Sequence, residues 1–391
     1  MHSENSSSST VTQREFPPFS VVRLLRTVFE PTAGKRLCIL IDLPDLAEAK
    51  DMAFLSNPKR PIQKHAVEQF YRPLNGDAAA ELGTSGGDLF AYEMTYGSNL
   101  DLPDLCVDMK GNELSLERNV YAKFDIILCI STFSATAPLT AFAKQFGFRG
   151  ATLHGLNDII LSTGLAVDYD EVSRNAEKLR LAMTRAEWVE IDFTVDSGEN
   201  MTVRLELDGQ EAQKSHGLCR GEKPDIANLP AGEVYFVPTG AEGAFPLKYE
   251  DGTLGKLTVT GGRIIKSELI EGNPETIAAH NQKLQDDPMT GVLGELGFGT
   301  QDLPVSGADI QDEKVFGTCH LATGRDDHLG GHLHPGLFRH HRNSTHDDIL
   351  FAPHKTPNFD ISQARMKRDG KVEILIEHFK AQPYLLAALN G

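Results

Sequence analysis

Two short runs of consecutive apolar residues lie in the first half of the chain. Residues 36–42 read Arg-Leu-Cys-Ile-Leu-Ile-Asp, and residues 124–131 read Phe-Asp-Ile-Ile-Leu-Cys-Ile-Ser. Apolar runs of this length without alternation are typical of strands that are buried on both faces of a parallel sheet. Residues 139–146, followed by Gly147, have helical spacing with a glycine stop, and the next strand is expected at 149–153. The pattern predicts an α/β arrangement with a parallel sheet.

The periodicity of the apolar positions changes near the middle of the chain. Between residues 169 and 185 they recur at helical spacing, whereas residues 188–195 and 201–207 alternate as strands do. From there on, Asp-Gly, Gly-Gly and Gly-Asn-Pro turn signals follow one another at short intervals. The second half is therefore expected to be rich in strands.

These changes suggest three segments. Residues 1–15 are rich in serine and other polar residues and lack the apolar core of a secretory signal, so we expect a disordered tail. Residues 16–185 are expected to form an N-terminal α/β domain with a parallel sheet. Residues 186–391 are expected to form a strand-rich α+β domain, and the fold class is α/β overall.

Composition and charge argue against several classes of function. The 391 residues are 40% hydrophobic and 24% charged, which is ordinary for a folded globular protein. A net charge of −17 would repel a phosphate backbone, so we expect no nucleic-acid partner. Apolar runs fall far short of the roughly 20 residues that span a bilayer, so no membrane partner is expected. The five cysteines lie in or beside apolar segments, as reduced buried thiols do, which favours a cytoplasmic location.

Histidines are concentrated near the end of the chain, where eight of the 14 fall between residues 320 and 354. A histidine-dense tract beside acidic residues is a compositional signal for metal binding, although an exposed flexible tract also produces it. Four of these histidines lie in a stretch rich in Gly, Pro and Arg and are expected on an exposed loop: His332, His334, His340 and His341. The loop 328–345 could cover a site as a lid or have no role in it.

Three other residues of the tract have a different setting. His320 lies in an apolar, strand-like segment, where an imidazole without a partner would be costly. His346 and Asp348 directly precede the apolar run Ile-Leu-Phe at 349–351. Because side chains at i and i+2 of a strand point to the same face, both can reach one metal ion.

Two glutamates are flanked by apolar residues and glycines. Glu295 lies in Gly-Val-Leu-Gly-Glu-Leu-Gly-Phe-Gly at 291–299, and Glu233 lies at the start of an expected strand. A buried carboxylate must be paired, protonated or bound to a metal ion. Metal coordination is one interpretation of both glutamates, and an ion pair with a distant Arg or Lys is the other.

Four segments in order resemble the ligand motifs of the aminopeptidase T family of metallopeptidases, across about residues 225 to 352. These segments are Asn-Leu-Pro-Ala-Gly-Glu-Val at 228–234, Leu-Gly-Glu-Leu-Gly-Phe-Gly-Thr at 293–300, Gly-Thr-Cys-His-Leu-Ala-Thr-Gly at 317–324 and His-Asp-Asp at 346–348. The resemblance implies an N-terminal α/β domain, a C-terminal catalytic domain with a dinuclear metal site, and a homodimer. By position, it implies the metal ligands Glu233, Glu295, His320, His346 and Asp348.

Such a ligand set suits two divalent ions, and its donor types fit Zn, Mn, Co or Fe(II) equally. Water bound to such ions has its pKa lowered from about 15.7 to about 7, which makes hydroxide on the metal the expected nucleophile. A free carboxylate is also needed to move protons, and Glu233 or Asp327 is the candidate for this catalytic role.

The sequence also departs from the peptidases. Where the peptidase members carry a tyrosine, seven residues after the position of His320, this chain has Asp327. Non-peptidase relatives in aromatic catabolism include an aromatic aminohydrolase and the dihydroxypyridine dioxygenases, which use a single iron. In the dioxygenases the glutamate motif carries a histidine and the next motif loses its own. This chain keeps Glu295 and His320, so it resembles the hydrolases more.

Three hypotheses follow. The first is a metallohydrolase that acts on an amine-bearing substrate, either at an N-terminal peptide bond or on an aromatic amine. The second is a mononuclear Fe(II) ring-cleaving dioxygenase that uses His320 and His346 with Asp348 or Glu295. The third is a metal-binding protein without catalysis. The identity of the small-molecule or peptide substrate is left open.

Overall fold

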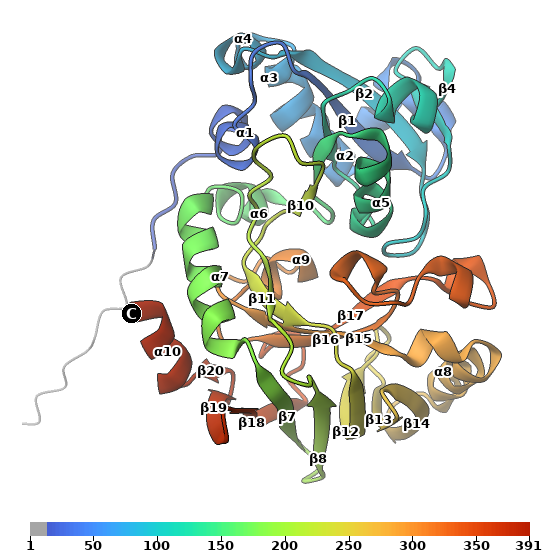
Figure 1. Cartoon of the computed structure of the whole chain (residues 1–391). Helices are drawn as coiled ribbons and strands as arrows, with labels where there is room; N and C mark the ends of the chain where they lie inside the picture. The colour runs from blue at the N-terminus through green and yellow to red at the C-terminus, as the bar shows by residue number, and fades with distance from the viewer. Residues whose placement is uncertain (1–13) are drawn as a thin grey trace, which may run out of the picture.

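The computed structural model describes residues 14–391, which fold into an N-terminal and a C-terminal half (Figure 1). The expected disordered tail of residues 1–15 lies, up to residue 13, outside the described residues. Between residues 14 and 391, the helices are all too short or too polar to cross a membrane.

The N-terminal half is built on a seven-stranded sheet with the order β10-β6-β5-β1-β2-β3-β4. Its strands are β1 (Arg36–Leu43), β2 (Ser85–Glu93), β3 (Leu105–Asp108), β4 (Glu113–Ser115), β5 (Ile126–Cys129), β6 (Arg149–Thr152) and β10 (Ile226–Asn228). Neighbouring strands from β10 to β2 are parallel, and β3 and β4 add an antiparallel edge. The predicted α/β fold class with a parallel sheet is confirmed.

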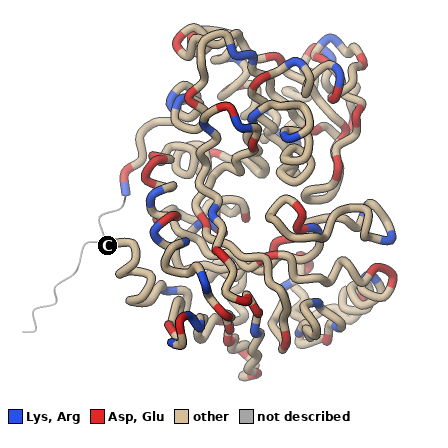
Figure 2. The backbone as a smooth tube through the Cα atoms, viewed as in Figure 1, with Lys and Arg blue, Asp and Glu red and all other residues tan. Residues whose placement is uncertain are grey.

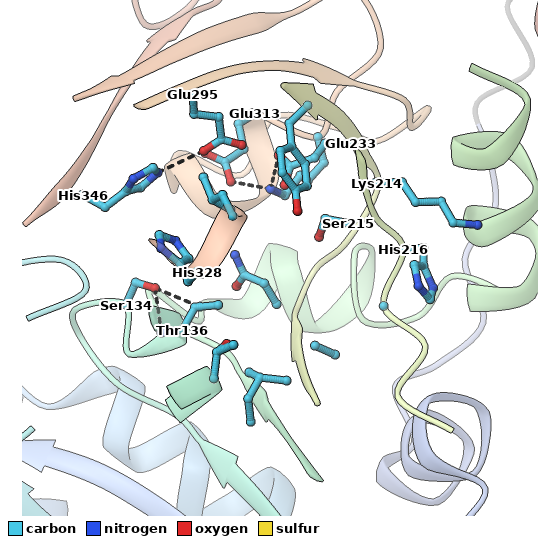
Figure 3. A pocket seen from close by; sticks show the side chains of 18 of the residues that line it. Ser134, Thr136, Lys214, Ser215, His216, Glu233, Glu295, Glu313, His328 and His346 are labelled. Atoms are coloured by element: carbon cyan, nitrogen blue, oxygen red, sulfur yellow. Dashed lines mark hydrogen bonds and ion pairs between the residues drawn. The ribbon is translucent and has the colours of Figure 1, made fainter. Parts of the chain in front are cut away.

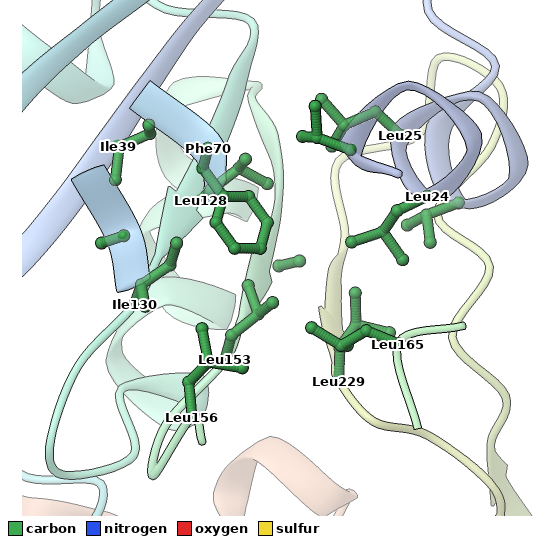
Figure 4. Close-up of a cluster of buried hydrophobic side chains, with 14 of the residues drawn as sticks. Leu24, Leu25, Ile39, Phe70, Leu128, Ile130, Leu153, Leu156, Leu165 and Leu229 are labelled. Atoms are coloured by element: carbon green, nitrogen blue, oxygen red, sulfur yellow. The ribbon is translucent and has the colours of Figure 1, made fainter. Parts of the chain in front are cut away.

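Strand β1 shows why its apolar residues do not alternate with polar ones. Ile39 lies beside Phe70 in the large core on one face of the sheet, to which helix α1 (Val21–Phe29) contributes Leu24 and Leu25 (Figure 4). Leu40, the next residue, packs on the opposite face together with Leu139 of helix α5 (Thr136–Phe146). Both faces of the strand are covered by helices, so every position is apolar.

The remaining helical segments of this half connect the strands or cover the sheet. They are η1 (Leu46–Ser56), α2 (Pro61–His65), η2 (Ala66–Tyr71), α3 (Arg72–Leu74), α4 (Asp77–Leu82), η3 (Leu116–Tyr121), α6 (Asp158–Ser162) and α7 (Tyr169–Met183). Helix α5 ends as predicted at Gly147, whose φ of 85° suits a residue without a Cβ.

The C-terminal half contains an eight-stranded sheet in the order β14-β13-β12-β8-β7-β18-β19-β20, and a five-stranded sheet in the order β17-β16-β15-β11-β9. The strands of the larger sheet are β7 (Ala186–Val195), β8 (Asn200–Glu206), β12 (Gly240–Lys248), β13 (Leu254–Thr260), β14 (Arg263–Glu271), β18 (Phe359–Arg368), β19 (Lys371–Glu377) and β20 (Lys380–Ala381). The smaller sheet consists of β9 (Gln213–Ser215), β11 (Glu233–Phe236), β15 (Leu293–Gly299), β16 (Cys319–Gly324) and β17 (His346–Phe351). The helical segments of the C-terminal half are α8 (Pro274–Asp286), η4 (Pro288–Gly291), α9 (Asp309–Asp312), η5 (Asp327–Leu329), η6 (Pro335–Leu337), η7 (His341–Asn343) and α10 (Pro383–Asn390).

These two sheets pack face to face. The ring of Phe193 on β7 lies 4.9 Å from the ring of Phe351 on β17, and Leu296 and Leu321 join the same core. One face of the five-stranded sheet is therefore buried against the larger sheet. In Figure 1 its strands lie between the larger sheet and the N-terminal half, so its other face looks toward the parallel sheet.

The predicted change from helical to strand periodicity is confirmed, because α7 ends at Met183 and β7 begins at Ala186. The division into domains at residues 185 and 186 stays a prediction. The chain returns once to the first sheet after this point, where β10 pairs with β6.

The burial of the cysteines and the distribution of charge can be compared with the composition of the chain. All five cysteines are buried and free, as predicted. Acidic and basic residues are interspersed along both halves (Figure 2).

Candidate metal centre

Four strands of the five-stranded sheet carry the five predicted ligands. Glu233 begins β11, Glu295 lies on β15, His320 on β16, and His346 and Asp348 on β17. Side chains alternate between the faces of a strand, and the intervening residues pack into the core between the two sheets. The five polar side chains therefore share the face that looks toward the N-terminal half.

Glu295 lies at the centre of this cluster. Its Oε2 is 3.0 Å from Nε2 of His346, and its Oε1 is 3.6 Å from Nε2 of His320. The side chain is only 5% exposed. A single carboxylate thus faces two imidazoles with its two oxygens, which is the arrangement of a bridging ligand.

The remaining two carboxylates lie on either side of Glu295. Asp348 Oδ1 is 3.2 Å from Nε2 of His346, and Glu233 Oε2 is 3.9 Å from Nε2 of His320. The predicted pair of His346 and Asp348 on one face of a strand is therefore present. All five residues that the sequence singled out as ligands lie together.

Backbone contacts orient His346. Its Nδ1 lies 2.6 Å from the carbonyl oxygen of Arg325. A carbonyl can only accept, so Nδ1 carries a proton, and in the neutral imidazole Nε2 is then the nitrogen with the lone pair. A hydrogen bond from the other ring nitrogen typically fixes the orientation of a metal-binding histidine, as Nδ1 does here. The Nε2 atom of His346 then faces Glu295 and Asp348.

Among residues 14–391, three groups of side chains could each hold a metal ion, with ligand atoms within 4.8 Å of one another. They are Glu233, Glu295 and His320; Glu295, His346 and Asp348; and Glu313, His320 and Asp348. Glu295 belongs to the first two groups, so these two could hold a pair of ions that share its carboxylate.

Two buried charged residues of this site, Glu313 and Lys314, were not expected from the sequence. Lys314 is 1% exposed, and its Nζ lies 2.6 Å from Glu233 Oε2 and 2.5 Å from Glu313 Oε1. In the sequence they belong to the run Gln-Asp-Glu-Lys at 311–314, which cannot be distinguished from a solvated charged turn. Glu233 therefore forms the ion pair that was the alternative interpretation from the sequence. It also belongs to a possible ligand group with Glu295 and His320.

The pKa values in the cluster show how strongly it requires positive charge. Burial alone would raise the pKa of Glu295, but hydrogen bonds from His320 and His346 lower it well below its usual range. Burial alone would lower the pKa of His320, but the carboxylate of Glu295 raises it to about 9. Burial raises the pKa of Glu313 to about 8, against the opposing effect of Lys314.

Metal ions fit this cluster. The possible ligand groups contain the buried carboxylates of Glu233, Glu295 and Glu313 and the partly exposed carboxylate of Asp348, and the ammonium group of Lys314 pairs with Glu233 and Glu313. Buried negative charge of this size requires further cations, supplied either by protons on the histidines or by metal ions. Carboxylate and imidazole donors are the ligands that Zn, Mn, Co and Fe(II) accept.

The sixth predicted site residue, Asp327, does not join the cluster. Its Oδ1 lies 2.7 Å from Nε of Arg325, and Arg325 in turn contacts Asp101 at 2.8 Å and the backbone oxygen of Asn99 at 3.0 Å. Asp327 therefore contributes to an ion network that connects the two halves of the molecule. The next residue, His328, lines the cavity instead.

A cavity of about 240 Å³ separates the cluster from the N-terminal half (Figure 3). The carboxylates of Glu233, Glu295 and Glu313 lie on one side of it, and Ser134 and Thr136 lie on the other. The loop before α5 and strand β10 contribute to this second wall, which also includes Asn99 and His154. Most of these residues are uncharged, and Lys214 and Asp225 are charged residues elsewhere in the lining.

Tyr235 also lines this cavity. It lies two residues after Glu233 on β11 and therefore on the same face of the strand. Burial, followed by the nearby charges of Glu295 and Glu233, raises its pKa, so the phenol keeps its proton. The same alternation rule that grouped His346 with Asp348 could have identified Tyr235 from the sequence.

The histidine-rich tract divides as predicted. His332, His334, His340 and His341 are exposed. His328 differs from them, because its side chain is 5% exposed and its ring lies 5.0 Å from that of His346, edge to face. The exposed histidines lie outside the lining of the cavity, whereas His328 and Leu329 line it.

The fold and this cluster define an α/β protein with a candidate metal site between its two halves. No family model and no curated protein matches the chain. The solved structure of 2,5-dihydroxypyridine dioxygenase from Pseudomonas putida KT2440 is similar with a TM-score of 0.59 at 14% identity, covering 93% of this chain and 95% of that one. AmpT from Thermus thermophilus is similar with a TM-score of 0.52 at 12% identity, covering 92% and 98%. At such low identity this likeness establishes a shared fold, and the resemblance found in the sequence is confirmed at that level.

Proposed function

We propose that this protein is a metal-dependent hydrolase with two divalent ions, acting on a small amine-bearing substrate. One observation carries the proposal: Glu295 belongs to two neighbouring groups of possible ligands and directs one oxygen to the histidine of each. A shared carboxylate is typical of sites that hold two ions about 3.5 to 4 Å apart. When bound, divalent ions supply Lewis acidity, which polarises the reacting centre and acidifies water.

The chain's own residues supply the proton transfers. Glu233 is hydrogen-bonded to Lys314, and Glu313 is the other partner of that lysine. A carboxylate held in this way beside the reacting centre can take a proton from water and return it to a leaving amine. Glu313, the other carboxylate held by this lysine, can fill this role, and Glu233, the candidate from the sequence, fills it only when it does not bind a metal ion.

Tyr235 takes the role of hydrogen-bond donor to the substrate, which a tyrosine at the position of Asp327 would have in the peptidases. Asp327 is directed toward Arg325, so neither its charge nor its oxygens are available to a substrate in the cavity. The phenol of Tyr235 is neutral and lines the cavity beside Glu233. A neutral O–H group at this place would stabilise negative charge that develops on the substrate.

The size and the polarity of the cavity favour a small substrate. Its volume of about 240 Å³ is below the roughly 300 to 1,000 Å³ that is usual for sites that take drug-sized ligands. The carboxylates on one side attract a protonated amine, and Ser134, Thr136 and Asn99 on the other side offer neutral hydrogen-bonding groups. A small aromatic amine or a single amino-acid amide suits this space better than an extended peptide.

A mononuclear Fe(II) dioxygenase is the second candidate, supported by the shared fold with 2,5-dihydroxypyridine dioxygenase. Such iron sites usually combine two histidines with one carboxylate. Within residues 14–391, each of the three possible ligand groups contains a single histidine and two carboxylates. The geometry therefore favours the hydrolase.

Oxygen dependence and metal content distinguish the candidates. The metal-loaded protein would be assayed with leucyl amide, aromatic amino-acid amides and small amino-aromatic acids, with ammonia release measured in air and under anaerobic conditions. Ammonia release that needs no oxygen, from a protein with two ions per chain, is the expected result. Oxygen consumption by a protein with one iron would support the dioxygenase, and bound metal without turnover of any substrate would support a binding protein.

We also propose that the protein is a cytoplasmic homodimer without nucleic-acid or membrane partners. The dimer rests on the resemblance to the aminopeptidase T family, and the location and the absence of nucleic-acid and membrane partners rest on composition and charge. Light scattering during size-exclusion chromatography tests the dimer, and a mass near 42.9 kDa at all concentrations would contradict it.

A further inference from the structure

Lys314 is a permanent cation inside the candidate metal centre. Its side chain is 1% exposed, and its ammonium group contacts one carboxylate oxygen each of Glu233 and Glu313. Hydrogen bonds to two carboxylate oxygens hold the lysine as an ammonium group, and both glutamates are partly neutralised.

The ammonium group acts on one of the two metal groups more than on the other. The oxygen of Glu233 that accepts from Lys314 is also the oxygen that faces His320 at 3.9 Å. The second group consists of Glu295, His346 and Asp348. Among the described residues, neither carboxylate of this second group forms an ion pair with a lysine or an arginine.

We propose that Lys314 makes the two metal positions unequal. The ion held by Glu295, His346 and Asp348 binds tightly, and the ion held by Glu233, Glu295 and His320 binds weakly. Two effects act in the same direction: the ammonium group shares the charge of Glu233, and it repels a divalent cation across a short distance in a poorly solvated space. The inference rests on the proposed dinuclear site and adds an order of loading to it. At limiting metal the chain would hold one ion, and the second would bind only when metal is plentiful.

Titration of metal-free protein with Co(II) tests this order, with visible absorption and calorimetry as readouts and elemental analysis after dialysis. Wild type is expected to retain one ion per chain after dialysis and to bind the second more weakly. Hydrogen-bonding partners of metal ligands typically change metal affinity by about 10- to 100-fold, and we expect a gap of at least about that size.

The informative variant is the double substitution Lys314→Met with Glu313→Gln. It removes Lys314 and one of its two carboxylate partners together, so Glu233 is the former partner that remains, and a divalent ion can pair with it. The gap between the two affinities should narrow by at least about tenfold, and the second ion should survive dialysis. Circular dichroism checks that the variant is folded.

Two control variants separate the lysine from other causes. Glu313→Gln alone keeps the contact between Lys314 and Glu233, so the two ions should still differ in affinity as they do in wild type. A loss of affinity in this variant would show that Glu313 is itself a ligand. Lys355→Met removes an exposed lysine that pairs with Asp309, and it should change neither affinity.

Two ions of equal affinity in wild type, or an unchanged gap in the double variant, would overturn the inference while leaving the metallohydrolase intact. A protein that binds no divalent ion at all would overturn both.

Discussion

The imidazole of His320 fills the space that a side chain at position 297 would need. Gly297 lies directly opposite His320 where β15 pairs with β16. A Cβ built on Gly297 would come within 2.1 Å of Cε1 of His320 and within 2.3 Å of its Nε2. Because no real Cβ approaches another atom so closely, the glycine of the Gly-Glu-Leu-Gly motif is needed to hold His320 next to Glu295.

Substitution of this glycine should therefore damage the metal centre. We expect Gly297→Ala to displace His320, to lose the ion that His320 holds even in excess Co(II), and to lower the free energy of unfolding by about 1 to 3 kcal/mol. Metal content and urea unfolding measure the two effects. Gly240→Ala is the matched control, because a Cβ there would meet only the side chain of Glu206, at 3.8 Å. Wild-type metal content in Gly297→Ala would show that His320 is not a ligand.

His346 and Asp348 provide a second test of the ligand assignment. His346→Ala and Asp348→Ala should each lose bound metal and activity while the fold is largely kept, because removing a ligand affects the site more than the core. Elemental analysis and circular dichroism check this. His340→Ala and His341→Ala, on the exposed part of the tract, should behave almost like wild type. Full metal occupancy with normal turnover in the first two variants would contradict the assignment.

Much of the site could be predicted because its ligands lie on strands. Alternation alone places His346 and Asp348 on one face, and apolar neighbours indicate that Glu295 and His320 are buried. Glu233 was predicted as a ligand from its position in the first of the four motifs that resemble the aminopeptidase T family. Local patterns were sufficient here because each residue's orientation follows from its own strand.

Lys314 and Asp327 could not be predicted in the same way. Lys314 lies outside the strands, two residues after the short helix α9, and becomes buried only because Glu233, 81 residues earlier, supplies its partner. The direction of Asp327 is set by Arg325, which itself contacts Asp101, 224 residues away. The return of β10 to the first sheet is of the same kind. These features depend on tertiary contacts, which leave no periodic signal in the sequence.

Tyr235→Phe tests the donor in the cavity. The substitution keeps the ring and removes only the hydroxyl, so metal content and the free energy of unfolding should stay close to wild type. Turnover should fall by roughly 100- to 1,000-fold, which is typical for the loss of one donor to a developing oxyanion, with a small change in KM. Kinetics on the best substrate of the panel measure this. Unchanged kcat would exclude Tyr235 from the reaction.

Asp327 gives a prediction about peptides. Because its carboxylate pairs with Arg325 outside the cavity lining, Asp327→Asn should leave the preferred activity nearly unchanged and cost less than about 1 kcal/mol of stability. Leucyl amide turnover should likewise be the same in wild type and variant, because Tyr235, and not residue 327, is the proposed donor to a developing oxyanion. Fast leucyl amide turnover, unaffected by Asp327→Asn, would favour a plain aminopeptidase.

The last prediction concerns stability at low pH and His280, a histidine outside the candidate metal groups. Burial, with a smaller contribution from Lys283, lowers the pKa of His280 to about 4. Its Nδ1 lies 2.6 Å from the hydroxyl of Tyr249, which also contacts Ser267 at 2.8 Å. The folded protein therefore keeps this imidazole neutral, whereas the unfolded chain protonates it below an ordinary histidine pKa of about 6.5.

Between these two pKa values the unfolded state binds more protons, so stability is complete above about pH 6.5 and falls as the pH drops toward about 4. A difference of this size corresponds to roughly 2 to 3 kcal/mol at the lower end. His280→Gln keeps a hydrogen-bonding partner for Tyr249 but does not titrate. We therefore expect the variant to lose less stability than wild type, by about that amount, between about pH 7.5 and about pH 4.5. Urea unfolding at both pH values measures the free energy of unfolding of wild type and variant. The titration of the metal cluster is common to both proteins, so it cancels when the two pH dependences are subtracted. His332→Gln, at an exposed position, is the control. Parallel pH dependence of wild type and His280→Gln would show that His280 does not resist protonation in the folded state.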